Sequence, residues 1–460
     1  MRKNIDMLSG PLVSSVIRFA FPVILAIYLQ NLFNTADMVV IGQFCGSLEV
    51  AGVSATSSLI NMFVGLVTGL SLGAGLTVAR AMGTKQPEEI SQAVHTAVPV
   101  ALIGGLILSV VGIIFSPALL RMMHTPKDVL PLASVYMQIY LSGILFSSVY
   151  NFGTAILRAI GDTKTPLYFL TIAGVLNIIL NMFFVSVLHM DVAGVAIATV
   201  ISQAVSAILV IITLMRRKDA CKFSFRKMQI RRSALISILR IGLPAGLQSS
   251  LFGMSHVITS SAINSFDSAA ILSGNGACQS IEVFTDSISS GFSQTISNFV
   301  AQNLGARQYN RIKKTYAACL GTSVFFISAA SAVICLFSKQ FLGLYITDSP
   351  EAISCGLVRM RYLLYPIFLM STMTVSTGGI LGLGHSLTSS VINLTTACGF
   401  RVAWIYTIFQ IPKYHTLDCV YAMYPISWIL TTAVSAPLFF ILLRRKVRSD
   451  TLQQAAVSPE

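Results

Sequence analysis

The stretch PVILAIYLQNLFNTAD, residues 22–37, belongs to the first long apolar run of the chain and interrupts it with polar side chains. On a helix, Gln30, Asn34 and Asp37 share one face, so the amides and the carboxylate would form one stripe turned away from lipid. Pro22, about four turns before Asp37, removes a backbone hydrogen bond and predicts a bend. A carboxylate at membrane depth costs roughly 2.5 kcal/mol or more, which makes Asp37 a candidate functional residue. The alternative is a structural acid that a neighbouring helix satisfies.

The composition places the whole chain in a membrane. Its 460 residues are 54% hydrophobic and only 10% charged, and the mean hydropathy is +0.76. A helix needs about 20 apolar residues to cross the hydrocarbon core, and twelve such runs cover most of the chain. The predicted fold class is therefore an all-α polytopic membrane protein with twelve transmembrane helices. The expected spans are 14–40, 51–79, 93–116, 132–157, 166–188, 192–215, 236–263, 269–301, 316–338, 353–382, 388–411 and 418–443.

The formal net charge of +14 comes from basic residues that cluster in short loops between the apolar runs. A membrane surface explains this distribution better than nucleic acid does. With the amino terminus inside, most basic residues fall in inner segments, and Arg359 and Arg361 near the tenth span are exceptions. The positive-inside rule then predicts a multi-pass protein of the cell membrane with both termini in the cytoplasm.

A basic stretch halfway along the chain separates two halves that repeat each other. Arg18 and Pro22 recur 222 positions later as Arg240 and Pro244, and further matches keep the same order. Two halves of six spans that start on the same side are parallel repeats, with a cleft between them for a substrate. The predicted organisation is an amino-terminal six-helix bundle at 1–215, a basic cytoplasmic linker at 216–235, a carboxy-terminal six-helix bundle at 236–448 and a short cytoplasmic tail at 449–460.

The acids within the spans are not duplicated by the repeat. At the 222-residue offset Asp37 faces Thr259. Asn177 and Asn181 lie four residues apart on the fifth span, so their side chains share one face. Carboxylate and amide oxygens suit a proton or a hard cation, and the amino-terminal half is therefore the expected place for ion binding.

The carboxy-terminal half contains a different polar set. Glu282 and Asp286 lie four residues apart on the eighth span, where like charges repel each other. Together with Arg401, which matches Asn177 in the repeat, they form a candidate second proton site. The alternative is that one acid reaches the membrane interface and the other pairs with Arg401.

Several absences from the sequence narrow the function. No GlyxxxxGlyLys(Ser/Thr) motif is present to hold ATP phosphates, so the energy for transport would come from an ion gradient. The eight cysteines are scattered singly and the six histidines show no ligand spacing. We therefore expect no disulfide, no cofactor and no metal beyond Na⁺ at Asp37.

Seven stretches together resemble the multidrug and toxic compound extrusion (MATE) family of antiporters. They lie in order along nearly the whole chain, five in the first half and two in the second. They are FPVIL at 21–25, NTADMVVIG at 34–42, LRAIGDTKTP at 157–166, NIILN at 177–181, VAGVAIATVISQ at 192–203, RIGLPAGLQ at 240–248 and QNLGA at 302–306.

The resemblance implies a V-shaped pair of six-helix bundles that exports organic cations in exchange for H⁺ or Na⁺. It assigns a cation site to the positions of Asp37, Asn177, Asn181 and Thr199, and a bend to that of Pro22. The sequence departs from the family at Asn181, where many members have Asp, and at Gln248, where another branch has Glu. A single carboxylate favours H⁺, although neutral oxygens could still hold Na⁺. The candidate cleft-lining residues are Gln30, Asn31, Asn34 and Gln248.

The leading hypothesis is a secondary antiporter, not an enzyme, that works as a monomer in membrane lipid on small organic cations. A flippase for a lipid-linked or polyprenyl-phosphate substrate is the alternative, and a basic central cleft would favour it. A receptor would need a signalling domain, and an intramembrane enzyme would need a nucleophile beside a base. The sequence shows neither pattern.

Overall fold

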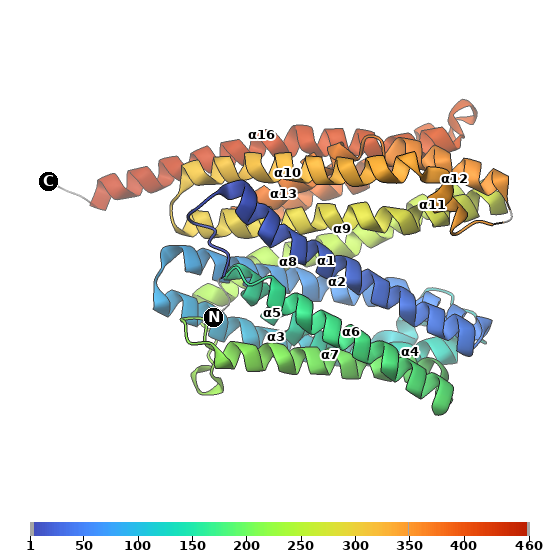
Figure 1. Ribbon diagram of the computed structural model, residues 1–460, viewed down its shortest axis with the longest axis horizontal. Coiled ribbons are helices and arrows are strands. Elements are labelled where there is room, and N and C mark those ends of the chain that lie inside the picture. The colour runs from blue at the N-terminus through green and yellow to red at the C-terminus, as the bar shows by residue number, and fades with distance from the viewer. Residues whose placement is uncertain (1–3, 348, 458–460) are drawn as a thin grey trace. The chain divides into compact units, whose positions relative to one another are not determined.

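The computed structural model describes residues 4–347 and 349–457, and every regular element in that part of the chain is a helix. The last residues of the predicted tail, 458–460, lie outside the described residues, as do Arg2 and Lys3. The prediction of an all-α membrane protein is confirmed. Figure 1 labels the helices in chain order. They are α1 (Leu12–Phe44), α2 (Ser47–Thr84), α3 (Pro87–Met122), α4 (Leu130–Ser142), α5 (Ile144–Ala159), α6 (Lys164–Met182), α7 (Asp191–Arg216), α8 (Arg232–Asn264), α9 (Ala269–Gly305), α10 (Tyr309–Leu336), α11 (Ser338–Gly343), α12 (Pro350–Leu363), α13 (Ile367–Gly382), α14 (Ser386–Ile392), α15 (Phe400–Tyr406) and α16 (Leu417–Val457).

Each of the twelve predicted spans coincides with one helix or with one broken helix. Among the described residues, nine helices are long and apolar enough to cross a membrane. Two further spans are pairs, α4 with α5 and α12 with α13, bent by 43° and 47°. The remaining predicted span is α9, which has 37 residues but is not among the helices that are apolar enough to count as a membrane span. A π-helical turn, Phe183–Val187, extends α6, and another, Asn393–Gly399, joins α14 to α15.

The internal repeat is visible in the backbone as well as in the sequence. Helices α2 and α9 begin 222 residues apart, as do α3 and α10, and α6 and α14. Lys85 and Arg307, also 222 apart, both have left-handed backbone angles, with φ of 57° and 56°. Gly161 and Gly384 have φ of 85° and 88°. The two bent pairs also occupy corresponding places, so the halves share their local irregularities.

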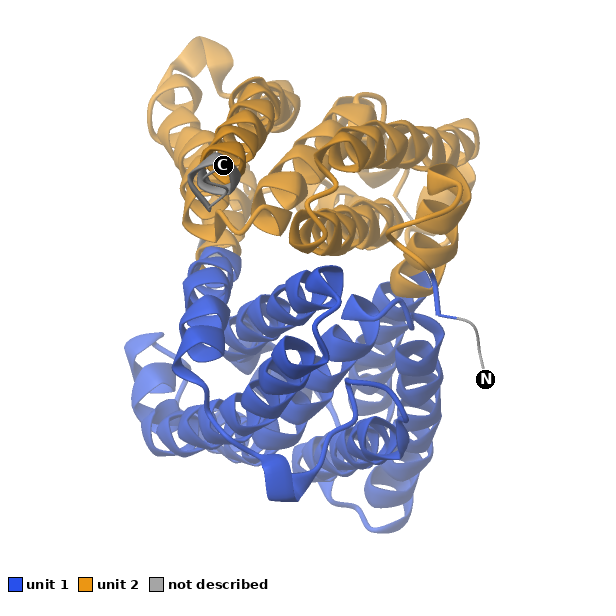
Figure 2. Ribbon diagram, turned by 90° about the vertical axis from the view of Figure 1, so that its left-hand side faces the viewer, with its two compact units in different colours: residues 1–5, 25–250 blue, residues 6–24, 251–460 orange. Residues whose placement is uncertain are grey.

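The chain forms two compact units, which Figure 2 shows in blue and orange. Unit 1 comprises Leu25–Ser250 and the chain up to Ile5, and unit 2 comprises Asp6–Ile24 and the chain from Leu251. Helices α1 and α8 therefore each contribute one part to either unit. The basic stretch 216–235 lies within unit 1, and the division of the chain into domains at that stretch stays a prediction.

Unit 1 contains a close helix contact built from glycines. A methyl group on Gly69 of α2 would lie 2.1 Å from the backbone nitrogen of Gly246 in α8, and one on Gly73 would lie 2.4 Å from the carbonyl oxygen of Ile238. Small residues let two backbones approach in this way where lipid offers no hydrophobic driving force for helix association. The first part of α8 is thus fixed against α2.

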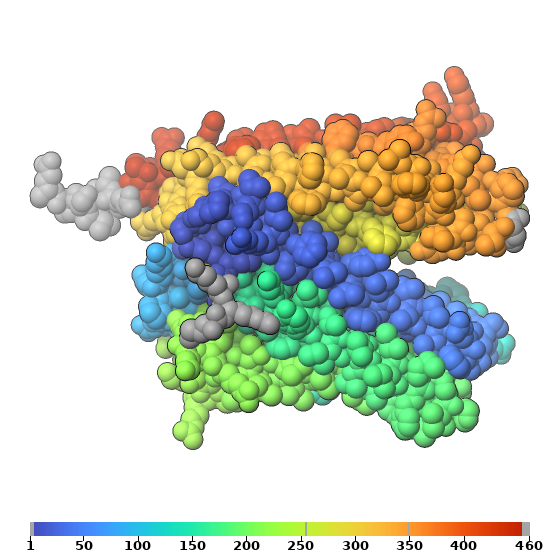
Figure 3. All heavy atoms as spheres, in the orientation of Figure 1, coloured from blue at the N-terminus to red at the C-terminus, as the bar shows by residue number. Residues whose placement is uncertain are grey.

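The outer helices present apolar side chains. Along α6, Ile172 and Ile179 are more than half exposed, and along α10, Phe325 is 67% exposed. Figure 3 shows the outer surfaces of these helices, α6 in green and α10 in yellow to orange. Exposed faces of this kind suit contact with lipid chains.

Candidate functional site

Four residues that the sequence analysis named together meet in unit 1. Asn181 of α6 donates from Nδ2 to Oδ1 of Asp37 in α1, at 2.6 Å, and also to Oδ1 of Asn177, at 3.3 Å. The hydroxyl of Thr199 in α7 lies 3.5 Å from the other carboxylate oxygen of Asp37. Asn177 closes the ring by donating from Nδ2 to Oγ1 of Thr199, at 3.3 Å. We call these four side chains the Asp37 ring.

Local helix geometry explains how the ring forms. Asn177 and Asn181 are one turn apart on α6 and are almost fully buried, with exposures of 6% and 0%. Helix α7 follows α6 after a short connection and packs against it. The Thr199 hydroxyl also donates to the carbonyl oxygen of Val195, one turn earlier, at 3.0 Å. The ring therefore rests on two adjacent helices, and only Asp37 comes from a distant part of the sequence.

The ring offers hard oxygen donors. The Oδ1 atom of Asn181 is buried and has no hydrogen-bond partner among the described residues, which is unusual for a buried carbonyl group. Carboxylate, amide and hydroxyl oxygens are the ligands of hard cations such as Na⁺, and a carboxylate can instead take up a proton. In the described part of the chain, no group of three or more His, Cys, Asp or Glu side chains is placed to hold a metal ion.

Two tyrosines of α4 lie near the ring, and sequence reasoning did not find them. Tyr136 and Tyr140 are within electrostatic range of the Asp37 carboxylate, and their ring centroids are 6.2 Å apart. Tyr136 packs in one apolar cluster with Val40 and Ile41 of α1. In the sequence these tyrosines look like ordinary members of an apolar run, so no local signal could have selected them.

The other polar residues of the first span do not join the ring. Gln30 and Asn34 are exposed, while Asn31 and, in α8, Gln248 are half-buried. Pro22 is buried inside α1, which continues through it as one helix. The expected cleft-lining role of the amides and the expected bend at the proline stay predictions.

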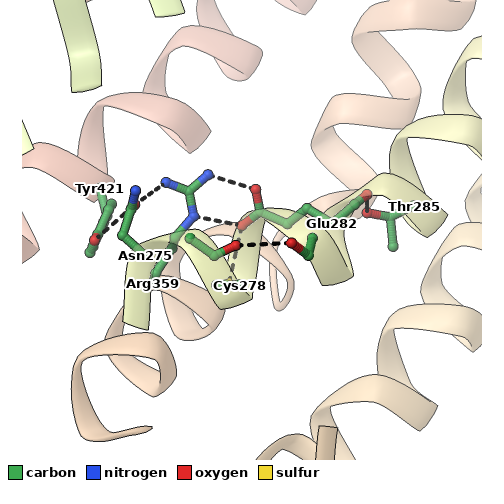
Figure 4. Close-up of polar contacts among 8 residues, drawn as sticks. Asn275, Cys278, Glu282, Thr285, Arg359 and Tyr421 are labelled. Atoms are coloured by element: carbon green, nitrogen blue, oxygen red, sulfur yellow. Dashed lines mark hydrogen bonds and ion pairs between the residues drawn. The ribbon is translucent and has the colours of Figure 1, made fainter. Parts of the chain in front are cut away.

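A second polar cluster lies in unit 2, around Glu282 of α9. Arg359 of α12 donates from Nε and Nη2 to the two carboxylate oxygens of Glu282, at 2.9 and 2.6 Å, and from Nη1 to Oδ1 of Asn275, at 2.6 Å. Tyr421 donates to the same oxygen of Asn275, at 3.3 Å, and the thiol of Cys278 donates to Glu282, at 3.3 Å. Figure 4 shows the guanidinium group of Arg359 between Asn275 and Glu282.

The pairing of Glu282 corrects one alternative from the sequence. Its ionic partner is Arg359, not Arg401. Arg401 of α15 donates from Nε to the hydroxyl of Ser427, at 3.1 Å, and its guanidinium lies 4.3 Å from the ring centroid of Tyr424. Asp286, one turn after Glu282, is exposed. The three residues of the candidate second proton site therefore do not form one ring, and their role in coupling stays a prediction.

The buried polar clusters and the helices of membrane-spanning length together indicate the class of protein. An all-α membrane chain with a repeat of six spans and ionisable groups inside its units is built as a membrane transport protein. The family model MatE matches residues 22–183 and 244–407. The two matches begin 222 residues apart, which is the offset of the repeat. The chain belongs to this family, the multidrug and toxic compound extrusion transporters.

Relatives and solved structures agree with this assignment. The chain is 28% identical over 395 residues, 85% of this chain and 87% of the relative, to "Probable multidrug resistance protein YpnP" of Bacillus subtilis strain 168. It is 23% identical to "Multidrug export protein MepA" of Staphylococcus aureus strain NCTC 8325 / PS 47, over 96% of both chains. A structure described as the outward-facing conformation of a multidrug resistance MATE family transporter superposes with a TM-score of 0.90, at 20% identity, over 97% of this chain and 99% of that one.

These likenesses confirm the predicted family and the fold of twelve transmembrane helices in two bundles. The family is one of transporters rather than enzymes. The flippase alternative is not favoured by the comparisons.

Proposed function

We propose that this protein is a secondary antiporter that exports organic, mainly cationic, compounds in exchange for H⁺ or Na⁺. The relatives described as multidrug resistance and export proteins support this substrate class. The observation that carries the coupling mechanism is the Asp37 ring, in which one carboxylate is held by neutral amide and hydroxyl groups.

The ring can change its charge without leaving a buried cation uncompensated. When Asp37 takes up a proton, its carboxyl group becomes a hydrogen-bond donor. Asn181, which already contacts Asp37, can then accept this hydrogen bond through Oδ1, which has no other partner among the described residues. Binding of Na⁺ would use the same oxygens. Either event shifts the balance between conformations only if one conformation binds the ion more tightly. We propose that α1, with Pro22 as the place where it bends, carries this change to the two units by alternating access.

Transport in proteoliposomes tests the proposal. Efflux of a fluorescent organic cation is measured under an imposed H⁺ gradient and, separately, under an imposed Na⁺ gradient. Asp37→Asn should abolish gradient-driven efflux, because the amide can neither take up a proton nor offer a charge to Na⁺. Asp128→Asn is the matched control, since Asp128 is an exposed acid between α3 and α4. Gradient-driven efflux that survives in Asp37→Asn would remove the role we assign to the ring.

A second variant separates the two coupling ions. Asn181→Asp places a second carboxylate beside Asp37, where Asn181 now donates at 2.6 Å. Two carboxylates in one site repel each other, and a shared proton or a bound cation relieves that repulsion. Because the second carboxylate also gives Na⁺ another charged ligand, we expect stronger dependence on Na⁺. An unchanged ion preference would mean that the charge of this ring does not select the ion.

The carboxy-terminal acids remain part of the proposal in a narrower form. Glu282 is held in an ion pair, so Asp286 is the better candidate for a second proton site. Asp286→Asn should then change the number of ions exchanged in each transport cycle. This number is obtained from the ratio of substrate and ion gradients at which net efflux of the fluorescent cation stops. An unchanged ratio would dispose of the second site.

We also propose that the protein lies in the plasma membrane as a monomer with both termini in the cytoplasm. The distribution of basic residues supports this orientation. Single cysteines introduced at Lys413 and Arg444, in a background without the eight native ones, should react with an impermeant thiol reagent from outside and from inside the cell, respectively. The reverse labelling pattern would contradict the orientation.

A further inference from the structure

The segment between α7 and α8, residues 217–231, is held firmly against α3; we call it the linker segment. Within it, Cys221 and Phe223 are each only 1% exposed. The backbone N–H of Ser224 donates to Nε2 of His95, at 3.1 Å, and His95 is itself 1% exposed. The ring of Phe223 lies 5.5 Å from that of His95. His95, one of the six histidines without ligand spacing in the sequence, thus fixes the first half of the linker segment.

A second attachment lies a few residues later. Thr96, the neighbour of His95 on α3, is fully buried and donates to the carbonyl oxygen of Gln229, at 3.3 Å. The same hydroxyl accepts from the backbone N–H of Arg231, at 3.2 Å. Between the two attachments the chain makes a short 3₁₀ turn, Phe225–Lys227. The side chains of this turn are therefore presented in a defined arrangement rather than by a loose loop.

The fixed turn and the residues just after it present apolar and basic side chains together. Phe225, Met228 and Ile230 are 54%, 43% and 47% exposed, and Arg226 and Lys227 between them are exposed as well. Large apolar groups pinned in an exposed position lose part of their contact with other apolar atoms unless something covers them. Two buried residues of α3, His95 and Thr96, hold the linker segment so that these apolar side chains stay exposed.

The charge of this surface is not neutralised by the linker segment itself. Its one acid is Asp219, which forms an ion pair with Arg217. Partial burial opposes ionisation of this carboxyl, but the hydrogen bonds and the charge of Arg217 hold the pKa of Asp219 below its ordinary value. Asp219 therefore satisfies Arg217 and leaves the cations around the 3₁₀ turn without an acidic partner in the segment.

We propose that residues 225–231 bind anionic phospholipid headgroups, with Phe225, Met228 and Ile230 inserted at the boundary between headgroups and acyl chains. The place of the segment in the chain supports this, because it joins the ends of two membrane-spanning helices and so emerges at the membrane surface. Apolar side chains interspersed with Lys and Arg are the pattern that binds the interface of an anionic bilayer. The charge of the segment is complementary to that of such a lipid.

The experiment uses the full chain with Phe225→Trp, reconstituted in vesicles that contain brominated phosphatidylglycerol or brominated phosphatidylcholine at equal mole fractions. The two native tryptophans give the same background in the parent protein, so the difference between variant and parent reports on position 225. We expect quenching at position 225 in both lipids and markedly stronger quenching by the anionic one. The preference should fall as salt is raised, because salt screens exposed charges.

Neutral variants then test the cause of the preference. Arg226→Gln with Lys227→Gln should reduce the relative association of the anionic lipid about 25-fold, roughly fivefold for each basic residue near the surface. Arg444→Gln with Arg445→Gln removes two exposed cations elsewhere and should leave the quenching at position 225 unchanged.

Three results would overturn the proposal. They are equal quenching by the two lipids, no quenching above that of the parent, and a preference that survives in the Arg226 and Lys227 double variant. If the segment instead binds an acidic protein, purified vesicles will give no quenching at position 225, which is the second of these results. The measurement needs no ion gradient and no transport, so its failure is distinguishable from failure of the antiport mechanism.

Discussion

The ion pair between Glu282 and Arg359 allows a quantitative prediction about unit 2. Both side chains are largely buried, with exposures of 11% for Glu282 and 3% for Arg359, and two hydrogen bonds join them. Glu282→Gln keeps the shape but leaves the guanidinium group without its counter-charge. Breaking a buried pair from one side costs about 3–5 kcal/mol of unfolding free energy. We expect the lower end, about 3 kcal/mol, because Asn275 and the ring of Tyr421 still contact Arg359.

The double variant Glu282→Gln with Arg359→Gln measures the coupling between the two groups. Once both charges are removed, no buried charge is left unpaired. The double variant should therefore lose less free energy of unfolding than the two single variants lose together. A coupling free energy of about 1–3 kcal/mol is expected for groups in direct contact. Unfolding of the purified protein in mixed micelles, titrated with a denaturing detergent, provides the free energies.

Asp286→Asn is the control on the same helix. Asp286 lies one turn from Glu282, and its side chain is exposed rather than joined to Arg359, so its amide variant should cost much less unfolding free energy than Glu282→Gln. Strictly additive single losses, or a loss below about 1 kcal/mol in Glu282→Gln, would show that the pair does not stabilise unit 2 as we reason.

Three other predictions concern backbone contacts. Gly69→Ala should lower the free energy of unfolding by about 1–3 kcal/mol through overpacking, because its methyl group would lie 2.1 Å from the α8 backbone. Gly253→Ala is the control, since a methyl group there would have no atom within 4 Å and should leave this free energy unchanged. Equal losses in the two variants would refute the reasoning. Gly161→Ala should lower the melting temperature more than Gly384→Ala, since both have positive φ but only Gly161 would place a methyl 2.3 Å from a backbone oxygen; equal losses would contradict the contact. His95→Ala should speed tryptic cleavage of the linker segment, which loses a hydrogen bond from Ser224, and an unchanged rate would show that His95 does not fix the segment.

The spans could be predicted from the sequence because the length of an apolar run is a local property. The bends inside two of them were not predicted. Helices α4 and α5 meet at Gly143, and α12 and α13 meet around Pro366, just before α13 begins. A glycine or a proline inside a long apolar run is tolerated in membrane helices, so the sequence alone does not distinguish a straight span from a broken one. The angle depends on packing against neighbouring helices.

The residues of the two polar clusters could be predicted from the sequence to different extents. For the Asp37 ring, helical spacing placed Asn177 and Asn181 on one face, and the family resemblance added Thr199. The partner of Glu282 could not be found in this way. Arg359 is 77 residues away in the chain, and beside Arg361 at the start of a span it looked like a charge at the membrane edge. A long-range ion pair leaves no periodic signal, and the repeat gave none because these charges are not duplicated.

The difference between these clusters bears on where coupling takes place. Protonation of Glu282 would remove the counter-charge of Arg359 and leave a buried cation, which costs several kcal/mol. Protonation of Asp37 would leave only neutral groups around it, because Asn177, Asn181 and Thr199 carry no charge. Asn181 can also accept a hydrogen bond from the protonated carboxyl group, since its Oδ1 has no partner among the described residues. The Asp37 ring can therefore exist in two charge states at modest cost while the Glu282 pair favours one. This asymmetry supports placing the proposed ion-driven step in unit 1 and a fixed structural pair in unit 2.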